Sequence, residues 1–183
     1  RLLLMIFSLF FSIYFMAIEV LNIDIPFLLN LLKNDIFSSI FVLLCFLFII
    51  NGANLIDGFN GLLTINLVII NSVLLYINIL NSNNEFSILL IAQIIILLSF
   101  LLFNFPSAKI FLGDSGSYVM GTLVSLNSII TNNLNPTYSL FFFCTILFYL
   151  FFEVLFSFLR KVIQNKSPCL LYTSPSPRDG LLS

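Results

Sequence analysis

The sequence predicts an all-α protein, a polytopic membrane bundle of about six transmembrane helices, and three observations support this class. Of the 183 residues, 60% are hydrophobic and 8% are charged, whereas a soluble domain carries about 25% charged residues. The apolar residues fall in long runs, and a helix needs about 20 of them to cross a hydrocarbon core of about 30 Å. Barrel-type alternation is not seen, and in lipid only helices and closed barrels satisfy every backbone polar group.

Six stretches are long and apolar enough to be predicted as spans. The first runs from near Arg1 and lacks the flanks of a cleaved signal peptide, so we expect it to be a true span. The second is short unless residues 51–56 continue its helix, and we extend it to residue 56. The fifth is the weakest, and its Gly121, Ser125 and Ser128 indicate a helix packed inside the bundle, because small residues let backbones approach closely. In chain order, the predicted spans are 2–21, 36–56, 62–80, 86–103, 117–133 and 137–159.

The cations indicate how the spans are oriented. Six spans place the N-terminus, the second and fourth connections and the segment after the last span on one side of the membrane. Up to residue 168, that side carries five cations and the other side carries Lys33. This asymmetry follows the positive-inside rule, so the first side is predicted to be cytoplasmic. Its cations are Arg1, Lys109, Arg160, Lys161 and Lys166.

Polar residues gather in two connections on the predicted cytoplasmic side. The stretch NGANLIDGFNG (51–61) holds three asparagines, three glycines and Asp57, and the stretch NFPSAKIFLGDSGS (104–117) holds Lys109 and Asp114. A carboxylate close to apolar helices is unfavourable unless a partner such as a cation offsets its charge. Magnesium is a suitable partner, because it binds one or two carboxylates, keeps some waters and takes its remaining ligands from substrate phosphates.

Neutral groups in the same loops favour this interpretation. Asn51 and Asn54 offer amide oxygens about one helical turn apart, and glycines let backbone N–H groups approach an anion. Lys109 supplies positive charge for a phosphate. The two loops together therefore predict a metal–phosphate site, although either loop alone could be a plain turn between helices.

Other functional classes stay open on these observations. No basic stripe indicates a nucleic-acid partner. A transporter or channel is one alternative, but transporters tend to have internal repeats and helices broken at mid-membrane, and neither feature is evident. A structural membrane component without a site is another, and it leaves Asp57, Lys109 and Asp114 unexplained. Asparagines within the spans, such as Asn71 and Asn78, are predicted to bond other helices and not ligands.

Two motifs identify a family resemblance. NGANLIDGFNGLLT and NFPSAKIFLGDSGSYVMGTL, in this order and about 50 residues apart, resemble the polyprenyl-phosphate N-acetylhexosamine-1-phosphate transferases, a bacterial membrane family. The end of the last span, FEVLFSFLRKVIQNKSP, is similar to the branch that initiates O-antigen synthesis. The resemblance covers residues 1–168, and it is the pair of motifs that makes it specific.

The resemblance implies a reaction, a cofactor and a location. The family transfers a sugar-1-phosphate, for which GlcNAc-1-phosphate is the favoured choice, from a UDP-N-acetylhexosamine to undecaprenyl phosphate. The reaction uses Mg²⁺ at the cytoplasmic face of the bacterial inner membrane and begins cell-envelope polysaccharide synthesis. The expected partners are thus the sugar nucleotide, the polyprenyl phosphate and the lipid bilayer; a homodimer is left open.

The resemblance also assigns roles by position. Asp114 resembles the family's metal-binding aspartate, and Asn54 resembles the asparagine that helps to hold the metal or its pyrophosphate. Asp57 and Asp114 are the catalytic candidates. Many relatives have a second aspartate where this chain has Asn60, so one charge is missing here. The candidates for substrate binding are Asn51, Asn54, Asn60 and Lys109.

The resemblance implies two elements that the sequence does not show. A paired-aspartate loop is expected before the first span, and a histidine-containing loop is expected after the last, yet the sequence has no histidine. We therefore expect residues 1–168 to be the partial membrane domain of a larger transferase, inactive by itself. Residues 169–183, CLLYTSPSPRDGLLS, resemble translated adapter sequence, so we expect a non-native tail. A genuine disordered tail is the alternative.

Overall fold

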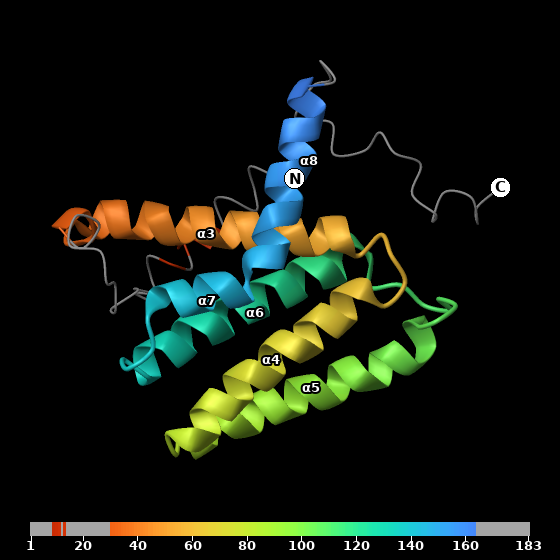
Figure 1. Ribbon diagram of the computed structural model, residues 1–183, viewed down its shortest axis with the longest axis horizontal. Helices are drawn as coiled ribbons and strands as arrows, with labels where there is room; N and C mark the ends of the chain where they lie inside the picture. The colour runs from red at the N-terminus through yellow and green to blue at the C-terminus, as the bar shows by residue number, and fades with distance from the viewer. Residues whose placement is uncertain (1–8, 12, 14–29, 164–183) are drawn as a thin grey trace.

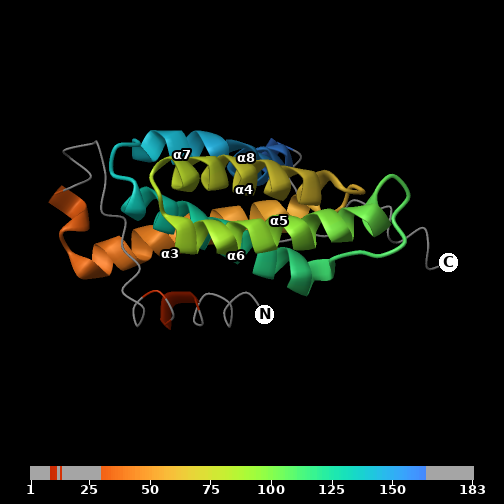
Figure 2. The same cartoon turned by 90° about the horizontal axis from the view of Figure 1, so that it is seen from below.

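The computed structural model describes residues 9–11, 13 and 30–163 of the chain. Within these residues every regular element is an α-helix, which confirms the predicted all-α class. Four long helices run beside one another, and the views in Figures 1 and 2 agree on this arrangement. The helices are α3 (Asp35–Ile56), α4 (Leu62–Leu80), α5 (Asn84–Asn104), α6 (Gly113–Leu134), α7 (Leu140–Ile146) and α8 (Phe148–Ile163).

By length and composition, three of these helices can cross a membrane. They are α3, α4 and α5, and a fourth span results if α7 and α8 count as one bent span. The predicted spans 36–56, 62–80 and 86–103 agree with these helices, and NGANLI does continue α3. The predicted span 2–21 lies outside the described residues except for 9–11 and 13, and the tail 169–183 lies wholly outside them. The expected six spans therefore exceed what the described helices support.

The predicted span over residues 137–159 is not one continuous helix. α7 ends at Ile146 and α8 begins at Phe148, with a bend of 65° between them. Figure 1 shows α8 turning across α3. No glycine or proline marks this break in the sequence. The bend is accompanied by a contact with a distant part of the chain. The backbone of Leu150 in α8 lies directly against Gly52 of α3, and a Cβ atom at position 52 would overlap the Leu150 backbone.

The fifth predicted span forms α6, but this helix is too polar to count among the candidate spans. It packs against both α3 and α4. Asn127 of α6 donates hydrogen bonds to Asn71 Oδ1 (3.1 Å) on α4 and to Gln93 Oε1 (2.6 Å) on α5. Asn78 of α4 donates to Thr131 Oγ1 of α6 at 3.0 Å. Asn71, Asn78 and Asn127 thus form hydrogen bonds between helices, as predicted for asparagines within the spans.

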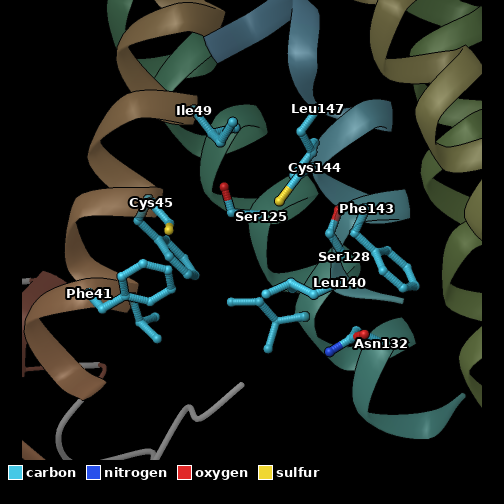
Figure 3. Close-up of a pocket in the computed structure, with 13 residues that line it drawn as sticks. Phe41, Cys45, Ile49, Ser125, Ser128, Asn132, Leu140, Phe143, Cys144 and Leu147 are labelled. Carbon is cyan, nitrogen blue, oxygen red and sulfur yellow. The ribbon is translucent and has the colours of Figure 1, made fainter. Parts of the chain in front are cut away.

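A cavity of about 100 Å³ lies between α3, α6 and α7. Figure 3 shows Cys45 of α3 and Cys144 of α7 beside it, with Ser125 and Ser128 contributed by α6. Both cysteine thiols are free. The lining residues of α3 and α6 lie one or more helical turns away from the polar loops, so the cavity belongs to the apolar part of the bundle and not to the candidate site.

Candidate functional site

Both polar loops lie at the same end of the bundle, where α3 and α5 end and α4 and α6 begin (Figure 1). Two hydrogen bonds join the loops directly. The Gly61 N–H donates to Asn104 Oδ1 at 2.6 Å, and Asn60 Nδ2 donates to the Pro106 carbonyl at 3.3 Å. The structure therefore brings the two motifs together, as the alternation of spans predicts.

The first loop has its predicted length, whereas the second is shorter than predicted because α6 begins within its motif. α3 continues to Ile56 and α6 starts at Gly113, which leaves residues 57–61 and 105–112 as the connections. Asn54 therefore lies in the last turn of α3 and Asp114 in the first turn of α6. Side chains on helices are held more rigidly than side chains on free loops, so these positions suit a preorganised site.

One hydrogen bond ties the two motifs together at their centre. The buried Ser117 Oγ donates to Asn54 Oδ1 at 2.9 Å and lies 3.0 Å from the carbonyl oxygen of Asp114. The bond directs the amide oxygen of Asn54 toward the first turn of α6. α3 and α6 run antiparallel, so the next residues toward the loops on the same faces are Asp57 on α3 and Asp114 on α6. Two carboxylates and an amide oxygen are thereby gathered at one end of this helix pair.

The two carboxylates lie in different electrostatic surroundings. Asp57 is 8% exposed and caps the C-terminus of α3, where its backbone N–H donates to the Ala53 carbonyl at 3.1 Å. The C-terminus is the negative end of a helix dipole and disfavours a carboxylate. Asp114 is half-buried at the N-terminus of α6, the positive end, which favours one. A cation between them would offset the unfavourable field at Asp57.

The chemistry of these donors fits magnesium. Among the described residues, no group of three or more His, Cys, Asp or Glu side chains could hold a metal ion. A complete protein cage is therefore not found in this part of the chain. Magnesium does not require one, since one or two carboxylates, waters and substrate phosphates complete its octahedron. Asp57, Asp114 and Asn54 provide oxygen donors of the hard type that this ion prefers.

The remaining candidates lie at the same end of the bundle. Asn51 is half-buried on α3, and its amide donates back along its own helix to the Leu47 carbonyl at 2.6 Å. Asn60 is exposed in the first loop. Lys109 is exposed in the second loop, and its backbone N–H donates to the Phe103 carbonyl at 2.9 Å. Asn60 and Lys109 are therefore accessible to a ligand, whereas Asn51 is partly covered by the bundle.

Asn104 is a site residue that the sequence analysis did not single out. It is the last residue of α5 and is 4% exposed. Its Oδ1 accepts from the Gly61 N–H, and its Nδ2 donates to the Ile110 carbonyl at 2.7 Å, so one side chain fastens both loops. Gly61 has a φ of +74°, a conformation that favours glycine. The sequence feature that could have indicated this role is a single asparagine at the end of an apolar run.

Comparison with known proteins matches this sequence to a family. Residues 1–132 match the model for glycosyl transferase family 4. The chain is 29% identical over 129 residues to undecaprenyl-phosphate alpha-N-acetylglucosaminyl 1-phosphate transferase of Thermotoga maritima, covering 70% of this chain and 38% of that protein. It is 39% identical over 111 residues to phospho-N-acetylmuramoyl-pentapeptide-transferase of Leuconostoc mesenteroides, covering 60% and 34%. No solved structure gives a significant match.

The fold and the site define a multi-pass membrane protein with carboxylate and amide oxygens gathered at one end of an apolar helical bundle. The family match covers both polar motifs and most of the chain, and the chain belongs to glycosyl transferase family 4. It spans 38% and 34% of the lengths of the two relatives described above.

Proposed function

We propose that the full-length protein transfers N-acetylhexosamine-1-phosphate, with GlcNAc-1-phosphate as the favoured group, from a UDP-sugar to undecaprenyl phosphate. The observation that carries the proposal is the Ser117–Asn54 hydrogen bond, which assembles oxygen donors from both motifs at one end of the bundle. Family membership supports it, as do relatives named for transfer to undecaprenyl phosphate and for phospho-N-acetylmuramoyl-pentapeptide transfer.

The proposed reaction is a phosphoryl transfer. An oxygen of the lipid phosphate attacks the β-phosphorus of the UDP-sugar, and the bond from that phosphorus to UMP breaks. Such reactions depend on positioning and charge stabilisation and need little covalent chemistry from the protein. A bound Mg²⁺ would act as a Lewis acid toward the pyrophosphate.

The residues of the chain have distinct roles in this proposal. Asp114 and Asn54 hold the cation, and Asp57 adds the second carboxylate. The N-termini of α4 and α6 point to the same end of the bundle and favour phosphate groups there. Lys109 and Asn60 approach the nucleotide from the rim, and Asn51 contacts it or its phosphates. The apolar helices keep the lipid substrate in the bilayer beside the bound nucleotide.

The proposed orientation places this end of the bundle in the cytoplasm of a bacterium, where UDP-sugars are made. It rests on the excess of cations on the side that includes Lys109 and Arg160. The product, a lipid-linked sugar pyrophosphate, is the kind of molecule on which cell-envelope polysaccharides are begun.

The test is magnesium-dependent exchange of labelled UMP into UDP-sugar by the purified full-length protein in the presence of undecaprenyl phosphate. We expect exchange with UDP-GlcNAc, and a panel that includes UDP-MurNAc-pentapeptide identifies the donor. Asp114→Asn should abolish exchange, whereas Asp35→Asn, an exposed carboxylate at the opposite end of α3, should leave it unchanged. A transporter or a non-catalytic relative would show no exchange with any donor, and full activity of Asp114→Asn would remove the metal assignment.

A further inference from the structure

The last turns of α3 are held from two directions by glycine contacts. On α6, a Cβ atom added to Gly121 would lie 2.8 Å from the Cα of Ile50 and 3.2 Å from the Cβ of Ala53. On α3 itself, a Cβ atom added to Gly52 would overlap the backbone of Leu150 in α8. Ile50 and Gly52 are two positions apart and point to nearly opposite faces of the helix. α3 is therefore clamped between α6 and α8 immediately before its polar end.

The Gly121 contact also sets how α3 and α6 are aligned along their length. One turn toward the loops from the Gly121–Ile50 contact lies the Ser117–Asn54 hydrogen bond of 2.9 Å. Asp114 and Asp57 follow at the next turn. The Gly121–Ile50 contact, the Ser117–Asn54 hydrogen bond and the two carboxylates thus follow one another along the helix pair. A shift of α3 against α6 at the contact therefore also moves the oxygen atoms of Asn54 and the two aspartates.

We infer that Gly121 and Gly52 are positioning residues, which set the spacing of Asn54 and the two aspartates for a divalent cation. The inference rests on the proposed function for its choice of ligand. Helices in lipid gain no hydrophobic driving force from association, so their separation depends on how closely backbones can pack. An added methyl group at either glycine must move a backbone, because backbone atoms are what it meets. A displacement of about 1 Å is enough to lower a rate by about 100-fold.

The experiment compares Gly121→Ala with wild type in the full-length protein, with Mn²⁺ as the probe for the cation. Binding of Mn²⁺ is followed by electron paramagnetic resonance, and the midpoint of thermal unfolding is measured on the same samples. We expect Gly121→Ala to weaken Mn²⁺ binding by about 10-fold or more, and UMP exchange to recover when Mn²⁺ is raised. A glycine that served stability alone would lower the midpoint without changing the affinity of the folded protein. Gly52→Ala should behave similarly.

Ala92→Val is the matched control, since it adds volume to an exposed position of α5 and should leave Mn²⁺ affinity unchanged. If Gly121→Ala does not fold, Ala53→Ser replaces it, because it adds one atom to the same contact. A folded variant with Mn²⁺ affinity within two-fold of wild type overturns the inference, and so does a wild-type protein that binds no Mn²⁺. If wild type binds Mn²⁺ but exchanges no UMP, the proposed function fails, while the comparison of affinities still decides the inference.

Discussion

Replacing Asn104 by alanine should release the two polar loops from each other. The change removes both hydrogen bonds of this side chain, the buried one of 2.6 Å from the Gly61 N–H and the partly buried one of 2.7 Å to the Ile110 carbonyl. Each bond contributes about 1 kcal/mol net, so the two bonds together contribute about 2 kcal/mol. A loss of about 2 kcal/mol in local stability corresponds to about a 30-fold increase in the open population.

Amide hydrogen exchange of the full-length protein measures this opening. Peptides that contain Gly61 should exchange about 30-fold faster in Asn104→Ala, while peptides from the opposite end of the bundle should be unchanged. Asn81→Ala is the matched control, because Asn81 bonds the Ile77 carbonyl at 2.9 Å at that opposite end. Unchanged exchange around Gly61, or equal acceleration at both ends, would show that Asn104 does not fasten the loops.

Three further predictions concern single side chains. Ser117→Ala removes the 2.9 Å hydrogen bond to Asn54, which costs about 1 kcal/mol, so the rate of UMP exchange should fall about 5-fold. An unchanged rate would mean that other contacts orient the Asn54 amide. Gly61→Ala places a Cβ atom at a residue with a φ of +74° and against Phe105, so the free energy of unfolding should fall by about 1–2 kcal/mol. An unchanged midpoint of thermal unfolding would contradict the observed conformation. Asn127→Leu removes the bonds from α6 to Asn71 and Gln93 and should destabilise the protein by about 1 kcal/mol in denaturant titrations. A stabilised variant would show that packing outweighs these two bonds.

The positions of the long helices were largely predictable. α3, α4 and α5 follow from apolar runs of membrane length, and the small residues around Gly121 correctly indicated an internal helix. The pairing of the polar loops followed as well, because alternating spans bring every second connection to one side. These features depend on composition over many residues, so no single contact is needed to infer them.

The break between α7 and α8 could not be predicted from the same information. Apart from Thr145 the residues around the bend are apolar, and none of them is a glycine or a proline, the residues that most strongly mark a break. The close backbone contact at the bend is with Gly52, which lies almost a hundred residues earlier in the chain. The role of Asn104 was hidden for a similar reason, since its partners belong to two separate loops.

From its amino acids alone, this chain could be assigned to the membrane, divided into helices and matched to a family by two motifs. Those properties are local, because lipid requires each helix to satisfy its own backbone and to present apolar side chains. The tertiary structure decided which oxygen atoms meet. Asn54 accepts a hydrogen bond from Ser117, and α3 and α6 approach closely where Gly121 has no side chain. That separation depends on van der Waals contact between distant segments, which no stretch of sequence contains by itself.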